Sequence, residues 1–354
     1  MTIEYLGYNQ TLEDFRTEQN LDSFAVGRVI LEHKERYVVK THQHEYDAEL
    51  IGSLRFNAES RYDFPAVGDW VAFSEYDNAK ALIHAIYPRK SVIERQAVGK
   101  LGQVQIIATN VDCGLIVQAV DRDFNLNRLE RYLTICNASK VEPIIVLSKI
   151  DLISEYELEN IISKINNRIK NVLTLTVSNQ TKGYIEVESL IRKGNTYCLM
   201  GSSGVGKSTL LNSLSGEEQM KTGEISSSVN KGRHITSHRE LIVLKNGGIL
   251  IDNPGMREVG IADSTKGLET TFKTIIELSK NCRFNDCTHT HERDCAVLDA
   301  VDNGKIDAKS YSNYIKIEKE KEHFESDAIE RKRKDKEFGK MVKNVKKQRK
   351  LNKY

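Results

Sequence analysis

The sequence predicts a multidomain α/β protein, because the texture of the chain changes twice along its 354 residues. Short alternating apolar runs over residues 24–97 predict an all-β domain, and strands that alternate with helices after residue 98 predict a parallel sheet. From residue 267 the pattern becomes helical and Cys-containing, and a Lys-rich end follows. We therefore expect four parts, at residues 1–97, 98–266, 267–330 and 331–354.

The composition excludes full disorder and a membrane span. Hydrophobic residues make up 39% of the chain and charged residues 29%, which is typical of globular proteins. The longest apolar runs are far shorter than the roughly 20 residues that cross a bilayer, and the N-terminus lacks a signal-peptide pattern. We therefore expect a cytoplasmic, monomeric protein that makes no membrane contact. In that compartment the six cysteines would not form disulfides.

Five alternating runs between Phe24 and Ala97 predict an OB-type β-barrel. Gly, Pro and Asn/Asp turns separate the runs, and none shows a helical period. Five strands and this length fit a barrel of the OB type, a fold that often binds nucleic acid. A β-domain that only packs or spaces remains the alternative. The runs lie at residues 25–33, 36–41, 48–54, 68–76 and 81–88, and residues 1–20 are expected to be irregular.

A phosphate-binding loop is the clearest motif. Residues 201–208, Gly-Ser-Ser-Gly-Val-Gly-Lys-Ser, match the P-loop pattern and lie between an apolar strand and a helix, as that pattern requires. Backbone N–H groups would converge on phosphate oxygens at the helix N-terminus. Lys207 would reach the β- and γ-phosphates, and the Ser208 hydroxyl would bind Mg²⁺. The expected ligands are Gly201, Ser202, Ser203, Gly204, Val205, Gly206, Lys207, Ser208 and Thr209.

A second phosphate-side motif follows the apolar run Gly-Ile-Leu-Ile. It reads Asp252-Asn-Pro-Gly255. An acidic residue that ends a buried strand beside the P-loop strand is where a Walker-B-type aspartate holds Mg²⁺ through water. Gly255 would donate its N–H to the γ-phosphate. A plain Asp-Asn-Pro-Gly turn is the alternative.

Residues 148–151, Ser-Lys-Ile-Asp, resemble the guanine-reading Asn-Lys-x-Asp element of the GTPase superfamily. An aspartate there accepts hydrogen bonds from the ring N–H and exocyclic amine of guanine, which adenine cannot supply. The Lys149 stem would cover the base. Ser178, after the next strand, matches one position of the superfamily's Ser-Ala-Lys loop. The expected base-side ligands are Ser148, Lys149, Asp151 and Ser178, with a chance match after a strand as the alternative.

The order of these motifs indicates a circular permutation. The base-reading segment precedes the P-loop by about fifty residues, whereas in ordinary GTPases it follows. Strand pairing does not depend on where the chain is cut, so the nucleotide pocket can survive intact. The middle part is therefore expected to be a circularly permuted P-loop GTPase domain.

The polar stretch 231–240 is long enough to be a switch loop. Thr236 is the candidate whose hydroxyl completes Mg²⁺ coordination when the γ-phosphate is present. Met256 stands where many GTPases carry a water-orienting Gln, and a thioether cannot orient a water. His234 is the nearest polar candidate for that task, and a loop histidine without a catalytic role remains equally open. The expected catalytic residues are thus His234, Lys207 and Thr236.

Three cysteines and a histidine within fourteen residues predict a metal site in the third part. Cys282, Cys287, His289 and Cys295 match the tetrahedral, sulfur-rich preference of Zn²⁺, and binding would supply folding energy that this polar segment lacks. Four protein ligands indicate a structural zinc. His291 is a possible substitute ligand, and a metal-free segment is the alternative.

The last part is a basic tail. Residues 331–354 hold twelve Lys/Arg against two acidic residues, whereas the preceding 330 residues carry 40 basic and 48 acidic. Apolar residues at helical spacing predict a helix over 336–350 with one apolar stripe and a basic remainder. Such a surface suits a phosphate backbone. A solvated, disordered tail is the alternative.

Together these residues resemble one family, the circularly permuted ribosome small subunit-dependent GTPase A, RsgA, also called YjeQ. The resemblance covers about residues 24–317. It implies that GTP/GDP with Mg²⁺ and one structural Zn²⁺ are the cofactors, and that small-subunit rRNA is the partner during late maturation. It also implies a role in hydrolysis for His234. Its further motifs are Val67-Gly-Asp-Trp70, Tyr87-Pro-Arg-Lys90 and Gly232-Arg-His234.

Three residues depart from the family pattern, and two other functions compete. Ser148 replaces the usual Asn, Ile235 a Thr, and Asn179 an Ala, which puts nucleotide affinity in question. One competing function is an RNA-binding scaffold in which nucleotide is mainly structural. The other is an adenine-using P-loop kinase or ATPase, which would leave Asp151 without a role.

Overall fold

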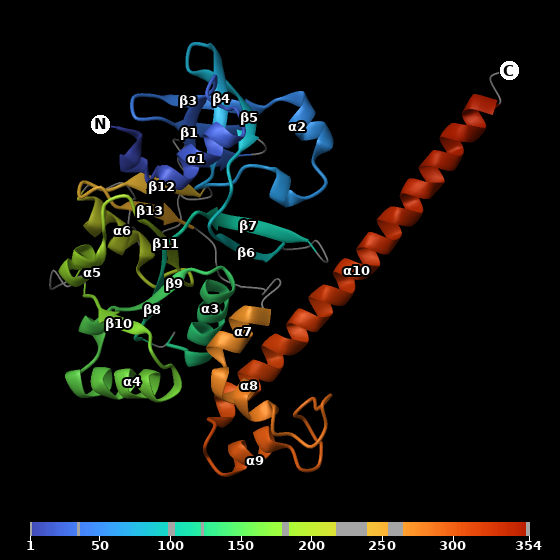
Figure 1. The fold of residues 1–354 in the computed structure, drawn as a ribbon. Coiled ribbons are helices and arrows are strands. Elements are labelled where there is room, and N and C mark those ends of the chain that lie inside the picture. The colour runs from blue at the N-terminus through green and yellow to red at the C-terminus, as the bar shows by residue number, and fades with distance from the viewer. Residues whose placement is uncertain are drawn as a thin grey trace, which may run out of the picture.

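The computed structural model describes residues 2–33, 36–97, 103–121, 124–178, 184–216, 239–253 and 265–351. Figure 1 shows a small β-barrel stacked on a helix-covered sheet, with a group of C-terminal helices beside the sheet and one long helix projecting from them. Among the helices that the structure describes, none combines the length and apolarity needed to cross a bilayer.

The N-terminal strands close into the predicted five-stranded barrel. Their order is β1-β2-β3-β5-β4, and pairing of β1 with β4 closes the ring. Val29, Tyr37, Val39, Phe73 and Ile83 fill the interior. The strands are β1 (Ala25–His33), β2 (Arg36–Lys40), β3 (Glu45–Leu50), β4 (Trp70–Asp77) and β5 (Lys80–Ile86).

Helical segments flank the barrel where the sequence predicted none. The first twenty residues, expected to be irregular, contain a 3₁₀ turn and a helix whose N-cap, Asn9, accepts a hydrogen bond from the N–H of Leu12. Leu6 and Leu12 pack against Trp70, so burial holds this segment on the barrel. The segments are η1 (Ile3–Leu6), α1 (Gln10–Glu18), α2 (Gly52–Asn57) and η2 (Arg61–Asp63).

The second region is a six-stranded sheet in the order β10-β9-β8-β11-β13-β12. All neighbours pair in parallel except β12, which runs antiparallel to β13. A single residue pair, Leu31 and Glu240, links β12 to β1 of the barrel. The strands are β8 (Cys113–Ala119), β9 (Glu142–Ser148), β10 (Leu173–Thr176), β11 (Thr196–Met200), β12 (Glu240–Val243) and β13 (Ile249–Asp252). A separate hairpin pairs β6 (Val92–Gln96) with β7 (Val104–Thr109).

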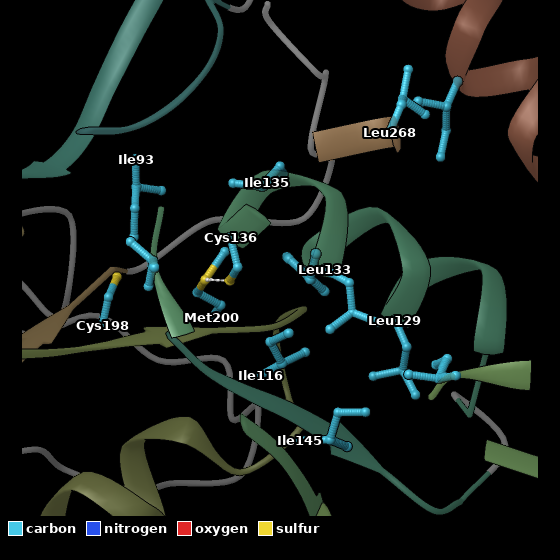
Figure 2. Packing of buried hydrophobic residues seen from close by; sticks show 14 of the residues in the cluster. Ile93, Ile116, Leu129, Leu133, Ile135, Cys136, Ile145, Cys198, Met200 and Leu268 are labelled. Carbon is cyan, nitrogen blue, oxygen red and sulfur yellow. Dashed lines mark hydrogen bonds between the residues drawn. The ribbon is translucent and has the colours of Figure 1, made fainter. Parts of the chain in front are cut away.

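Helices cover both faces of this sheet, as a parallel sheet requires. One face packs on α3 (Leu126–Ala138) and α4 (Glu155–Arg168), and the other on α5 (Ile185–Leu190) and α6 (Lys207–Ser215). Figure 2 shows Leu129, Leu133 and Cys136 of α3 directed at Ile116 and Met200 of the sheet. The predicted α/β layering is therefore confirmed, and η3 (Ile150–Leu152) follows β9.

The C-terminal region consists of four helices around the Cys/His segment. They are α7 (Thr265–Thr271), α8 (Lys273–Ser279), α9 (Ala296–Asp302) and α10 (Ala308–Leu351). The Phe272 and Tyr314 rings pack edge to face with centroids 5.4 Å apart. The helix expected over 336–350 is the distal end of α10, which continues without a break from residue 308 and projects away from the body (Figure 1).

A buried arginine joins the barrel to the sheet region. Arg28 on β1 donates to the carbonyl oxygens of Leu6 at 2.6 Å, Gly68 at 3.1 Å and Asn110 at 3.3 Å. Its guanidinium lies over the Trp70 ring. Burial lowers the pKa of Arg28 to about 10, which leaves it charged at neutral pH. Three chain segments therefore meet at one cation.

Candidate nucleotide and metal sites

The expected nucleotide ligands lie at the carboxyl ends of adjacent parallel strands. Residues 148–151 follow β9, Ser178 follows β10, residues 201–207 follow β11, and Asp252 ends β13. Open α/β sheets bind ligands at this edge. Segments separated by about a hundred residues are thus collected in one place.

The P-loop connects β11 to α6 and depends on its glycines. Gly201, Gly204 and Gly206 have φ values of 144°, 81° and 97°. A Cβ on Gly201 would lie 2.3 Å from the carbonyl oxygen of Val117, so no side chain fits there. Gly206 is the N-cap of α6. The loop therefore presents backbone N–H groups at a helix N-terminus, the arrangement that binds phosphate.

Lys207 is buried and held against this loop. Its Nζ donates to the carbonyl oxygens of Gly201 at 2.8 Å and Ser202 at 2.7 Å. Both acceptors belong to the P-loop itself. The ammonium therefore lies beside the backbone groups that would hold the phosphates, and Ser208 follows in the first turn of α6.

Asp252 provides a buried carboxylate on the strand next to the P-loop strand. Only 3% of the residue is exposed, and Cys198 of β11 pairs with Ile251 just before it. Burial raises the pKa of the Asp252 carboxyl, and attraction from Lys207 acts in the opposite direction. Because burial disfavours the ionised carboxylate, a nearby cation would stabilise it. This is compatible with a metal ion near the P-loop.

Each of the four base-side residues has a polar partner in the structure. Ser148 donates from Oγ to the carbonyl oxygen of Val205 at 2.5 Å, which ties the base-reading segment to the P-loop. Lys149 has a left-handed backbone with φ of 59°, and its Nζ lies 2.9 Å from Oδ2 of Asp121. Asp151 accepts a hydrogen bond from Ser178. Ser148 therefore contacts the loop directly, and Asp151 and Ser178 are joined to each other.

Several expected residues lie outside the described part of the chain. They are Thr236 and His234 of the switch stretch, Gly255 and Met256 after Asp252, and Asn179 after Ser178. Their roles stay predictions.

The Cys/His segment forms a compact four-ligand cluster. Ligand atoms of Cys282, Cys287, His289 and Cys295 all lie within 4.8 Å of one another. Sγ of Cys282 is 3.8 Å from Sγ of Cys295, and each sulfur is 3.5 Å from Nδ1 of His289. Tetrahedral Zn²⁺ with ordinary bond lengths separates two sulfurs by about 3.8 Å and sulfur from nitrogen by about 3.5 Å.

Local structure explains which histidine belongs to the cluster. His289 has φ of 57° and is buried, and Tyr311 of α10 donates to its carbonyl oxygen. Cys295 is the N-cap of α9 and accepts from the N–H of Leu298 at 3.5 Å. His291 is exposed and contacts Thr290 instead. The structure therefore favours His289 over the substitute ligand.

Comparison with known proteins identifies the family. The RsgA GTPase family model matches residues 86–262. A small ribosomal subunit biogenesis GTPase RsgA 1 of Bacteroides thetaiotaomicron is 37% identical over 98% of this chain and 97% of its own length. The chain belongs to the RsgA GTPase family. RsgA 2 of Lactiplantibacillus plantarum is 41% identical over 90% of both chains.

Two solved structures share the fold. YjeQ from Thermotoga maritima matches with a TM-score of 0.61 and 25% identity, over 82% of this chain and 96% of that one. YloQ, described as a circularly permuted GTPase, matches with a TM-score of 0.58 and 24% identity, over 84% and 96%. As a member of the RsgA GTPase family, this chain is a GTPase with a permuted sheet, as its motif order predicted.

Sequence reasoning missed two charged residues at the nucleotide site. Asp121, just after β8, pairs with Lys149, and Arg128 in the first turn of α3 donates from Nη1 to Oγ of Ser202 at 3.1 Å. Neither belongs to a recognisable motif. The only signal for Arg128 is its position, because a cation in a first helical turn opposes the helix dipole.

Proposed function

We propose that this protein binds GTP with Mg²⁺ and hydrolyses it to GDP and phosphate while acting in late maturation of the small ribosomal subunit in the cytoplasm. The curated relatives carry the name small ribosomal subunit biogenesis GTPase, and they match nearly the whole chain. Stimulation by the subunit is part of the proposal. With Met256 next to Gly255, the free enzyme has no water-orienting Gln there.

The observation that carries this proposal is the hydrogen bond from Ser148 to the Val205 carbonyl. It supports a shared site, because it joins the proposed base-reading segment to the loop that would hold the phosphates, although 57 residues separate the two partners. Asp151, within reach of Ser178, is the carboxylate that would select guanine. One nucleotide can therefore contact both motifs at once.

In the proposed site each residue has a defined task. Lys207 and the loop N–H groups hold the phosphates, while Ser208 and Asp252 hold Mg²⁺, which would neutralise phosphate charge. Thr236, Gly255 and His234 would act on the γ-phosphate side, where His234 orients water. The hydrogen bonds of Lys207 to the loop and the buried position of Asp252 on the adjacent strand support the roles given to these two residues.

The other parts are proposed to serve the ribosome-bound state. Cys282, Cys287, His289 and Cys295 would hold one structural Zn²⁺, supported by their spacing. We propose that the barrel and the basic residues of 331–354 contact rRNA, supported by fold and charge. The protein is proposed to act as a monomer whose working parts are residues 1–97, 98–266, 267–330 and 331–354.

The decisive experiment measures GTP hydrolysis with and without purified small subunits. We expect slow turnover alone and a clear increase with subunits, and no increase would contradict the proposal. Lys207→Ala should abolish nucleotide binding, whereas Lys164→Ala, an exposed lysine on α4, should behave as wild type. Full biological rescue by Lys207→Ala would favour the scaffold function instead.

A further inference from the structure

Arg128 contacts the P-loop from a helix that belongs to the other side of the sheet. It donates to Oγ of Ser202 at 3.1 Å, while Lys207 donates to the carbonyl oxygen of the same residue at 2.7 Å. The helix dipole opposes a cation at this N-terminus, and the first turn of α3 contains no acidic residue that would offset it. An anion bound by the P-loop would offset this repulsion. The position of Arg128 therefore suits a residue beside a phosphate site.

The same helix carries the docking site of α10. Two residues along from Arg128, Glu130 is 2% exposed, and its carboxylate accepts from Arg168 of α4 at 2.6 and 2.7 Å. It also accepts from Ser310 at 2.6 Å and Asn313 at 2.7 Å, both in the first turns of α10. The hydrogen-bonding capacity of this buried carboxylate is therefore satisfied, which holds α3, α4 and α10 in a fixed arrangement.

A second contact binds α10 one residue further along α3. Arg131 forms a bidentate (two-pronged) ion pair with Glu320, with N–O distances of 2.5 and 2.8 Å. Two-pronged guanidinium–carboxylate pairs add orientation as well as energy. Two consecutive residues of α3, Glu130 and Arg131, thus hold α10 at points from Ser310 to Glu320, a span of about three turns.

The far end of α3 holds α7 at very short range. A Cβ on Gly267 would lie 2.2 Å from the carbonyl oxygen of Thr134, so only glycine permits this approach. Asn137 also donates to the hydroxyl of Thr271 at 2.9 Å. Because α3 is additionally packed against the sheet (Figure 2), it cannot shift without moving several partners.

We propose that α3 couples the P-loop energetically to the docking of α10, with Arg128 as the positioning residue at the P-loop end. Nucleotide held by the P-loop fixes Ser202 and Arg128, and this favours the α3 position that Glu130 and Arg131 need to hold α10. By linkage, firm docking of α10 favours nucleotide binding to the same extent. The inference rests on the proposed function only for the identity of the nucleotide.

A double-mutant cycle in the full-length protein tests the coupling. The variants are Arg128→Ala, Glu320→Gln, which weakens the ion pair to Arg131, and the two combined, with Lys164→Ala as the matched surface control. The measurement is the Kd for a fluorescent GDP analogue in Mg²⁺ buffer. We expect Glu320→Gln to weaken binding about threefold in the wild-type background and to have little effect in the Arg128→Ala background.

Conservative variants of Arg128 and Arg131 distinguish a positioning role from a general effect on folding. Arg128→Lys keeps a donor near Ser202 and should restore part of the affinity lost in Arg128→Ala. Arg131→Lys should reproduce the Glu320→Gln effect, because a lysine cannot form the two-pronged pair. Equal effects of Glu320→Gln in both backgrounds, with wild-type binding intact, would overturn the coupling.

Hydrogen exchange, measured first without nucleotide and then with GDP, provides a second readout. Amides of residues 309–321 in α10 should exchange about threefold faster in Arg128→Ala than in wild type or Lys164→Ala. GDP should slow their exchange in wild type but not in Arg128→Ala. Unchanged exchange in Arg128→Ala would overturn the inference, whereas failure of the wild-type protein to bind guanine nucleotides would count against the proposed function.

Discussion

Ser178 donates a hydrogen bond from its hydroxyl to Oδ1 of Asp151 at 2.8 Å, although the two residues follow different strands. The strands, β9 and β10, are parallel neighbours, with Thr176 paired to Leu147. One oxygen of Asp151 is therefore oriented by Ser178, which follows the neighbouring strand at the same edge of the sheet. A guanine-selective site needs such a carboxylate to be held in place before the base arrives.

Asp151→Asn should relax the preference for guanine over adenine. The carboxylate would accept from the ring N–H and the exocyclic amine of guanine, and an amide presents only one oxygen. We expect GDP affinity to fall by at least about tenfold, with ADP affinity little changed. Competition of GDP against ADP for the nucleotide-free protein measures both. Retained guanine preference in this variant would remove Asp151 from the base site.

Ser148→Ala should loosen the connection between the base-reading segment and the P-loop. It removes the hydrogen bond to the buried Val205 carbonyl, which then lacks this partner. We expect an affinity loss of about fivefold for GDP, equivalent to one ordinary hydrogen bond. Isothermal titration checks this, with Ser189→Ala on α5 as an exposed serine control. Equal affinity of Ser148→Ala and wild type would show that the tether does not matter.

The motifs predicted the sheet and the ligand edge well because they combine local pattern with a defined strand context. The strand over 25–33 agrees with its predicted position. Gly52 to Leu54 was expected to extend a strand and instead begins α2, since three residues cannot distinguish the two periods. Contacts such as Arg128 with Ser202 escaped prediction because they depend on packing between elements far apart in sequence.

Removing the metal should disorder the Cys/His segment without abolishing nucleotide binding. We expect one zinc per chain by elemental analysis, and its loss on treatment with a strong chelator or in Cys287→Ser. Hydrogen exchange should then rise over residues 282–295, while GDP still binds to the P-loop. Cys113→Ser, at a cysteine outside the cluster, should keep the metal. Full zinc content in Cys287→Ser would exclude Cys287 as a ligand.

Asp252→Asn should stabilise the nucleotide-free protein and weaken its response to Mg²⁺. Burial raises the folded-state pKa of Asp252 above the usual 3.8, so the folded protein binds this proton more tightly than the unfolded chain. Ionised Asp252 therefore lowers stability at neutral pH, and this cost fades as the pH falls from the folded-state pKa through 3.8.

Thermal unfolding across pH checks this sign. The melting temperature of Asp252→Asn should exceed that of wild type at pH 7 without nucleotide, and the difference should shrink near about pH 4. Added Mg²⁺ and GDP should raise the melting temperature of wild type more than that of the variant. A variant that is less stable than wild type at pH 7 would contradict the prediction.

Arg89→Ala should strongly destabilise the barrel, because it leaves a buried carboxylate without its partner. Arg89 donates to Asp69 at 2.6, 2.9 and 3.1 Å, and the Asp69 side chain is fully buried. Breaking one side of such a pair costs about 3–5 kcal/mol. Lys80→Ala breaks an exposed pair with Asp77 and should cost under about 1 kcal/mol.

Urea unfolding of wild type, Arg89→Ala and Lys80→Ala tests whether the Arg89–Asp69 pair is structural. Asp69 follows Gly68, whose carbonyl oxygen accepts from Arg28, so loss of Arg89 also weakens the junction between barrel and sheet. We therefore expect Arg89→Ala to unfold at clearly lower urea than Lys80→Ala. Equal midpoints would mean that Asp69 finds another partner. The contact between the motifs 67–70 and 87–90 would then serve a purpose other than stability.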